Sequence, residues 1–108
     1  MDQPIWLLEK YVSDSGTCPF DKWKATLDEK AQSRVDDRLD RLRFGNFGDH
    51  KPIGEELYEL RFFFGPGYRI YYAIVEGRII LLIAGGDKKT QSKDIRKAKN
   101  IWNRYNAE

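Results

Sequence analysis

Apolar side chains recur every three or four residues between positions 20 and 42, which is the spacing of one helix face. They are Phe20, Trp23, Leu27, Ala31, Val35, Leu39 and Leu42. One helix of that length is unusual in a small domain, and the carboxylate of Asp28 is suited to cap a second helix. We therefore predict a helical hairpin that is broken near Asp28. Its opposite face, which we interpret as solvated, carries Arg34, Asp37, Arg38 and Arg41.

Runs of apolar and aromatic residues between turn residues predict four strands. These strands are expected at residues 5–12, 56–64, 68–75 and 78–84. Gly65-Pro66-Gly67 and Glu76-Gly77 connect the last three strands so closely that these must be antiparallel neighbours. Residues 45–55 contain three glycines and a proline, which predicts a loop without regular structure.

A second amphipathic pattern predicts a helix from Thr90, its expected N-cap, to about Asn106. The apolar face of this helix carries Ile95, Ala98, Ile101, Trp102 and Tyr105. The predicted order is β-α-α-β-β-β-α. It describes an α+β fold with a small antiparallel sheet, an N-terminal helical hairpin and a C-terminal helix. We expect a single domain that spans residues 1–108.

Composition excludes several classes of chemistry. The chain has 108 residues, with Cys18 as its one cysteine and His50 as its one histidine. An intramolecular disulfide is therefore impossible, and a metal centre or a catalytic triad built on several such residues is not expected. We expect no cofactor. The chain shows neither the pattern of a secretory signal nor the ~20 apolar residues of a membrane span, so we expect a cytoplasmic protein.

The formal net charge is only +2, but the charge is unevenly distributed. Residues 87–108 carry seven Lys/Arg and three Asp/Glu. This basic C-terminal segment suggests a polyanionic or acidic partner. The alternative is a solvated helix whose basic end complements the helix dipole.

Two arginines, Arg61 and Arg69, interrupt apolar strands, and a guanidinium in that position must face water or an anion. A register that pairs Phe63 with Arg69 places both arginines on one open sheet face together with Glu59 and Tyr71, whereas a slip of one residue separates them. Cations, a carboxylate and an exposed aromatic ring are suited to RNA. The alternative is a surface ion pair of Glu59 with Arg61 or Arg69, which is the commoner arrangement in proteins.

Five segments occur in an order that is specific. They are Y-V-S-D-S-G-T-C-P-F-D-K-W at 11–23, G-N-F-G-D at 45–49, L-Y-E-L-R at 57–61, G-P-G-Y-R-I-Y-Y at 65–72 and L-L-I-A-G-G-D-K-K-T-Q at 81–91. Over residues 11–98 this combination resembles the phage-derived addiction module killer branch of the RelE/ParE toxin superfamily, which is often grouped with HigB-type toxins.

This resemblance implies a toxin of a type II toxin–antitoxin pair with the RelE-like fold. It implies a metal-independent endoribonuclease that cleaves mRNA, usually on the ribosome. The implied partner is a helix-turn-helix antitoxin, through which the complex would reach operator DNA. The ParE-like members inhibit DNA gyrase instead, so the alternatives are a toxin without nuclease activity and an inactive phage remnant.

The resemblance also implies roles for individual residues. Arg69 matches an arginine that contacts the scissile phosphate, and Arg61 matches a basic strand residue near the reacting groups. Lys88 or Lys89 follows the last strand where a catalytic arginine lies in the family. Glu59 replaces a lysine of the family and is the expected general base. The residues expected to contact RNA are Lys51, Tyr71, Lys89 and Lys93.

Overall fold

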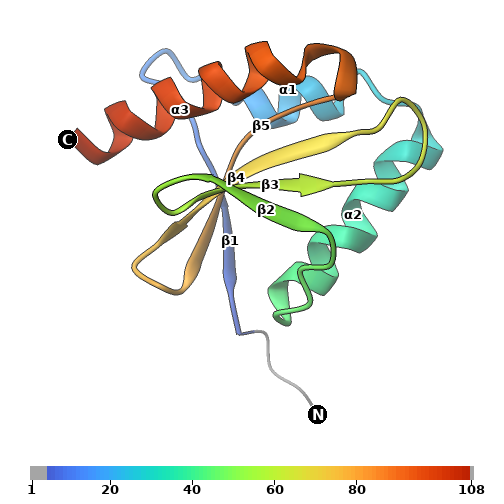
Figure 1. Cartoon of the computed structure of the whole chain (residues 1–108), viewed down its shortest axis with the longest axis horizontal. Coiled ribbons are helices and arrows are strands. Elements are labelled where there is room, and N and C mark those ends of the chain that lie inside the picture. The colour runs from blue at the N-terminus through green and yellow to red at the C-terminus, as the bar shows by residue number, and fades with distance from the viewer. Residues whose placement is uncertain (1–4, 108) are drawn as a thin grey trace.

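The computed structural model describes residues 5–107 (Figure 1). The chain forms, in order, β1 (Leu7–Lys10), α1 (Pro19–Lys24), α2 (Glu29–Arg43), β2 (His50–Gly54), β3 (Leu57–Arg61), β4 (Arg69–Val75), β5 (Ile79–Gly86), a 3-10 turn η1 (Lys88–Thr90) and α3 (Gln91–Ala107). This arrangement confirms the predicted α+β class, with a helical hairpin near the N-terminus and a helix at the C-terminus. No helix within the described residues is long and apolar enough to cross a membrane.

The strands form one sheet in the order β1-β5-β4-β3-β2. Strands β3, β4 and β5 pair antiparallel, as expected, and β2 adds to them antiparallel, but β1 pairs with β5 in parallel. The sheet is therefore mixed, and the expectation of a purely antiparallel sheet was wrong at this edge. The physical reason is the helical hairpin between β1 and β2, which carries the chain across before the meander of β2 to β5 begins.

The second edge strand, β2, lies in a segment that we expected to be a loop. His50–Gly54 pairs with β3, and its register shifts between Pro52 and Gly54. Proline is tolerated there because an edge strand need not donate every backbone N–H to a neighbour. The glycines and the proline of this segment therefore mark an irregular edge strand rather than the absence of a strand.

Helices cover both faces of the sheet, with α2 and α3 on opposite sides of the strands (Figure 1). On one face, α1 and α2 bury Phe20, Val35, Leu39 and Leu42 against the sheet. On the other face, α3 buries Ala98 and Trp102 against Leu57, Tyr71, Ala73 and Leu81. The sheet is thus the middle layer of three, and the face that we expected to be open is covered over much of its length by α3.

The hairpin breaks where the sequence indicates. The side chain of Asp28 accepts a hydrogen bond of 2.8 Å from the backbone N–H of Ala31 and so caps α2. The expected cap of the last helix, Thr90, was wrong in its role. Asp87 accepts from the backbone N–H groups of Lys89 and Thr90, while the Thr90 hydroxyl accepts from the N–H of Asp87. This capping box fixes the chain that follows β5.

Two adjacent glycines at the end of β5 let helices approach the sheet from both faces. A Cβ atom on Gly85 would lie 2.2 Å from the ring of Trp23 in α1, and a Cβ on Gly86 would collide with the Asp94 carboxylate in α3. Because the neighbour of Gly85 is a bulky indole held in the core, a side chain there cannot be accommodated cheaply.

We predict that Gly85→Ala lowers the free energy of unfolding by roughly 1–3 kcal/mol through this overpacking. Chemical denaturation measures the change. The matched control is Gly54→Ala, because a Cβ there would meet Leu57 only at an ordinary contact distance of 3.8 Å. Equal stabilities of the two variants would contradict the packing argument.

Candidate functional site

The two strand arginines lie directly opposite each other. In the β3–β4 ladder Arg61 pairs with Arg69, and Glu59 pairs with Tyr71. Of the two alternatives that the sequence left open, the structure has the one in which these four residues share a face. The ladder is offset by two residues from a pairing of Phe63 with Arg69, and a shift of two leaves the face of every side chain unchanged.

Beside this arginine pair the surface is hollowed into a cleft of about 420 Å³. Its lining residues are Asp49, Arg61, Phe62, Phe63, Gly65, Gly67, Arg69 and Lys88. Three of the four residues expected to be catalytic therefore meet at one cleft, and they come from β3, β4 and η1. Of the two lysines that sequence left open as candidates, Lys88 lines the cleft and Lys89 does not.

Arg61 is held at the cleft by a carboxylate that sequence reasoning overlooked. Its Nη2 donates to Asp49 Oδ1 at 3.0 Å, and this hydrogen bond, followed by the charge of Asp49, raises the pKa of the guanidinium. Asp49 ends the G-N-F-G-D segment, which we had used only as a family signature within an expected loop. No local pattern indicated its place beside Arg61, because the strand that follows Asp49, β2, was itself expected to be a loop.

A third arginine fixes the backbone of this wall without facing the cleft. Arg38, on α2, donates from Nη1 to the carbonyl oxygen of Arg61 at 2.8 Å and from Nη2 to that of Asp49 at 3.1 Å. Burial, and then the nearby charge of Arg41, lowers the pKa of Arg38. These bonds tie α2 to β3 at Arg61 and to the segment just before β2 at Asp49. They fix the backbone on both sides of the Arg61–Asp49 ion pair.

Arg69 is the most buried of the cleft arginines, since its side chain is 11% exposed. Its Nη1 donates to the carbonyl oxygen of Gly67 at 2.6 Å, and its Nε lies 3.6 Å from Glu59 Oε2. Gly67 has φ +77°, and a Cβ there would come within 3.1 Å of Arg69 Nη1. The glycine of the G-P-G-Y-R segment is therefore needed both for the turn and for the placement of the guanidinium.

Glu59 does not face the cleft, so its expected role as a solvent-facing general base was wrong. Its side chain is fully buried, because α3 begins directly above it. Oε2 accepts from Tyr71 Oη at 3.2 Å and from Gln91 Nε2, on α3, at 2.9 Å. Glu59 is instead a buried counter-charge that positions Arg69 and joins β3, β4 and α3.

Tyr71 cannot stack on a nucleobase, which corrects the second expectation for this face. The ring is fully buried beneath α3. Burial and then the charge of Glu59 raise the pKa of the phenol far above its ordinary value. Tyr71 therefore remains protonated and donates its hydrogen bond to Glu59.

The remaining expected contacts lie around the cleft rather than in it. Lys51 pairs with Glu59 across β2 and β3, Lys89 belongs to η1, and Lys93 lies in the first turn of α3. All three side chains are exposed, and none lines the cleft. Their contact with RNA stays a prediction. No cluster of three or more potential metal ligands occurs within residues 5–107.

The comparisons with known proteins now place the chain. The profile of the phage-derived protein Gp49-like family (DUF891) matches residues 22–106. The chain belongs to the Gp49-like family. An uncharacterized protein of Haemophilus influenzae is 44% identical over 84 residues, which is 77% of this chain and 85% of the relative. Residues 22–106, which the family profile matches, contain the helical hairpin from Lys22 onward and every residue of the cleft.

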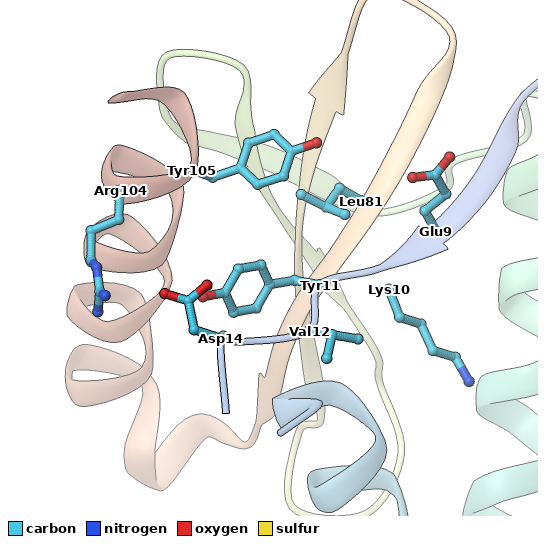
Figure 2. A pocket seen from close by; sticks show the side chains of 8 residues that line it. All are labelled: Glu9, Lys10, Tyr11, Val12, Asp14, Leu81, Arg104 and Tyr105. Atoms are coloured by element: carbon cyan, nitrogen blue, oxygen red, sulfur yellow. The ribbon is translucent and has the colours of Figure 1, made fainter. Parts of the chain in front are cut away.

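A second hollow of the Gp49-like protein, of about 200 Å³, lies between β1 and α3. Figure 2 shows Tyr11 at its centre, pointing toward the helix that carries Arg104 and Tyr105. Its charged residues are mixed in sign, with Glu9 and Asp14 beside Lys10 and Arg104. None of the residues expected to be functional lines it, so the cleft beside β3 and β4 remains the candidate site.

We predict that Glu59→Ala lowers the free energy of unfolding by about 3–5 kcal/mol, because it leaves the buried Arg69 guanidinium without its counter-charge. Urea denaturation measures the loss. Glu55→Ala is the control, since Glu55 is exposed and uses its backbone carbonyl, not its carboxylate, to bind Trp102. The buried role of Glu59 would be disproved by two variants that unfold at the same urea concentration.

Proposed function

We propose that this Gp49-like protein is a toxin that cleaves RNA at the cleft of Arg61, Arg69 and Lys88. The observation that carries the proposal is the convergence of these three cations, from separate elements, on one cleft of about 420 Å³. Two guanidinium groups and an ammonium group are suited to a phosphodiester. The planar guanidinium donates two parallel hydrogen bonds to phosphate oxygens, and the ammonium group adds a positive charge. The phage origin of the family is compatible with a toxin role.

In the proposed reaction the ribose 2′-oxygen attacks the neighbouring phosphorus, and the bond from phosphorus to the 5′-oxygen breaks. The products are a 2′,3′-cyclic phosphate and a free 5′-hydroxyl. The proton of the 2′-hydroxyl passes to a base, and a second proton is supplied to the leaving 5′-oxygen. Arg61 and Arg69 stabilise the charge that develops on the phosphoryl oxygens.

The cleft offers one group for each proton transfer. Asp49 is the carboxylate that lines it and takes the place of Glu59 as the proposed base. Lys88 is proposed to contact the scissile phosphate and to donate the proton to the leaving oxygen. The capping box of Asp87 and Thr90 supports this role, because it fixes the backbone on either side of Lys88.

The partners proposed with this activity are mRNA on the ribosome and a helix-turn-helix antitoxin that also brings the complex to operator DNA. The resemblance to HigB-type toxins supports both. The exposed lysines of η1 and α3 support the first, because a basic surface beside the cleft would attract the nucleic-acid backbone.

We expect Lys88→Ala to reduce the rate of RNA cleavage by about 10²–10³, the usual cost of removing one group that stabilises the transition state. Primer extension on cellular mRNA after induction measures new 5′ ends, and growth measures toxicity. Lys22→Ala is the control, because this exposed lysine of α1 lies outside the cleft and outside the basic surface of η1 and α3. Arg69→Ala is a poorer variant, since it strands the buried Glu59 carboxylate.

The proposal fails if the two lysine variants are equally toxic. It also fails if the wild-type protein arrests growth while transcripts stay intact and DNA breaks accumulate. That second result would support inhibition of gyrase instead.

A further inference from the structure

One aromatic ring at the rim of the cleft is almost fully exposed. Phe63 follows β3 in a run of three phenylalanines, and its side chain is 90% exposed. Phe62 is buried in the core and Phe64 is packed against it. Single exposed apolar side chains are common on protein surfaces, but this ring lies at the rim of a cleft that is lined by cations. The core therefore accounts for the two flanking rings and leaves Phe63 unexplained.

Phe63 is a wall between two hollows. Its ring lines the candidate cleft with Arg61, Arg69 and Lys88. It also lines an adjacent hollow of about 290 Å³ against α2, which we call the α2 hollow. The charged residues that line the α2 hollow are Arg34, Asp37, Arg38 and Arg41. Cations therefore lie on both sides of the Phe63 ring. Asp37 is the one carboxylate among the residues that line the α2 hollow.

The arginines of α2 differ in how far they are already engaged. Arg38 is bound to backbone carbonyl oxygens, and its guanidinium lies 4.9 Å from the centre of the Phe62 ring. Arg34 lies 4.6 Å above the Phe64 ring, and Arg41 is exposed. The face of α2 that sequence indicated as merely solvated thus turns Arg34 and Arg41 toward the surface beside Phe63.

The turn that carries Phe63 is rigid. The N–H of Phe62 donates to the carbonyl oxygen of Tyr68 at 3.0 Å, and that of Gly67 donates to Phe64 at 3.3 Å. Gly65 has φ +60°, and a Cβ there would come within 2.9 Å of the Tyr68 ring. The backbone of this turn is therefore formed before a ligand arrives, which limits the backbone entropy lost on binding.

From these observations we infer that Phe63 is a stacking platform for the base of a nucleotide next to the scissile phosphate, and that Arg34 and Arg41 hold the following backbone phosphates. This inference rests on the proposed function, since it extends the substrate path from the catalytic cleft across Phe63 to α2. Single-stranded RNA is the occupant that fits, because it alternates flat base faces with phosphates as the surface alternates ring and cations.

A binding experiment on the full-length chain tests the stacking. The probe is a fluorescein-labelled hexanucleotide of 2′-O-methyl ribonucleotides, which lacks the 2′-hydroxyl proton and is not cleaved. We expect Phe63→Leu to weaken binding about tenfold and Phe63→Trp to restore it, because stacking needs an aromatic face. Phe44→Leu, at another exposed phenylalanine, 47% exposed, should bind like the wild type.

A second set of probes identifies the base. An abasic site at one position of the hexanucleotide should weaken binding to the wild type about as much as Phe63→Leu does, and should not weaken binding to Phe63→Leu further. Equal affinity of wild type and Phe63→Leu for the intact probe would overturn the stacking platform. Loss of antitoxin binding by Phe63→Leu with unchanged affinity for RNA would also overturn it and would assign the ring to a protein interface.

The failure of this inference can be told apart from failure of the proposed function. Lys88→Ala should weaken binding of every probe, with or without the abasic site, because it removes a phosphate contact. If Lys88→Ala weakens binding and Phe63→Leu does not, the catalytic cleft stands and the stacking platform falls. If the wild type binds no probe, or Lys88→Ala has no effect, both fall.

The salt dependence of binding tests the arginines of α2. We expect Arg41→Ala to reduce the slope of the logarithm of affinity against the logarithm of salt concentration by about 0.7, the value for one phosphate contact on a single strand. Arg78→Ala, at an exposed arginine between β4 and β5, is the control and should leave the slope unchanged. An unchanged slope in Arg41→Ala would remove α2 from the proposed RNA path.

Discussion

The buried contact between Glu59 and Arg69 is the constraint on which the rest of the site depends. A carboxylate that is fully excluded from water needs a counter-charge and hydrogen-bond donors, and it finds them in Arg69, Tyr71 and Gln91. These partners belong to β4 and α3, so one side chain of β3 fixes the position of α3 over the sheet. The same contact holds Arg69 nearly buried at the cleft wall.

The position of α3 in turn decides which part of the sheet face remains accessible. The helix begins at Gln91, above the Glu59–Tyr71 pair. It does not cover the next pair on the same face, Arg61 and Arg69, whose side chains line the cleft. Gly86 permits this approach, because any side chain there would collide with Asp94. The covered part of the face is therefore part of the core, and the uncovered part lines the candidate site.

Sequence patterns predicted what depends on local periodicity. They predicted the fold class and the Asp28 break, because caps and strand alternation act over a few residues. For Arg61 and Arg69 they left two registers open, of which one places both on the same face. They failed at β2, where an edge strand tolerates Pro52. They also failed at Glu59 and Tyr71, whose burial follows from a helix that begins 32 residues after Glu59 and 20 residues after Tyr71. No local signal could place Asp49 beside Arg61 or distinguish exposed Phe63 from its buried neighbours.

The central claim is that the cations of the cleft promote cleavage of a phosphodiester by its own 2′-hydroxyl, and that the buried Glu59 positions Arg69 without taking part in proton transfer. The chemistry of the RNA ends tests this most directly. After induction of the protein, cellular mRNA fragments can be captured according to their termini and sequenced. The account predicts new 3′ ends that carry a 2′,3′-cyclic phosphate, paired with 5′-hydroxyl ends one nucleotide further. Fragments with 5′-phosphate ends, or intact mRNA in growth-arrested cells, would contradict it.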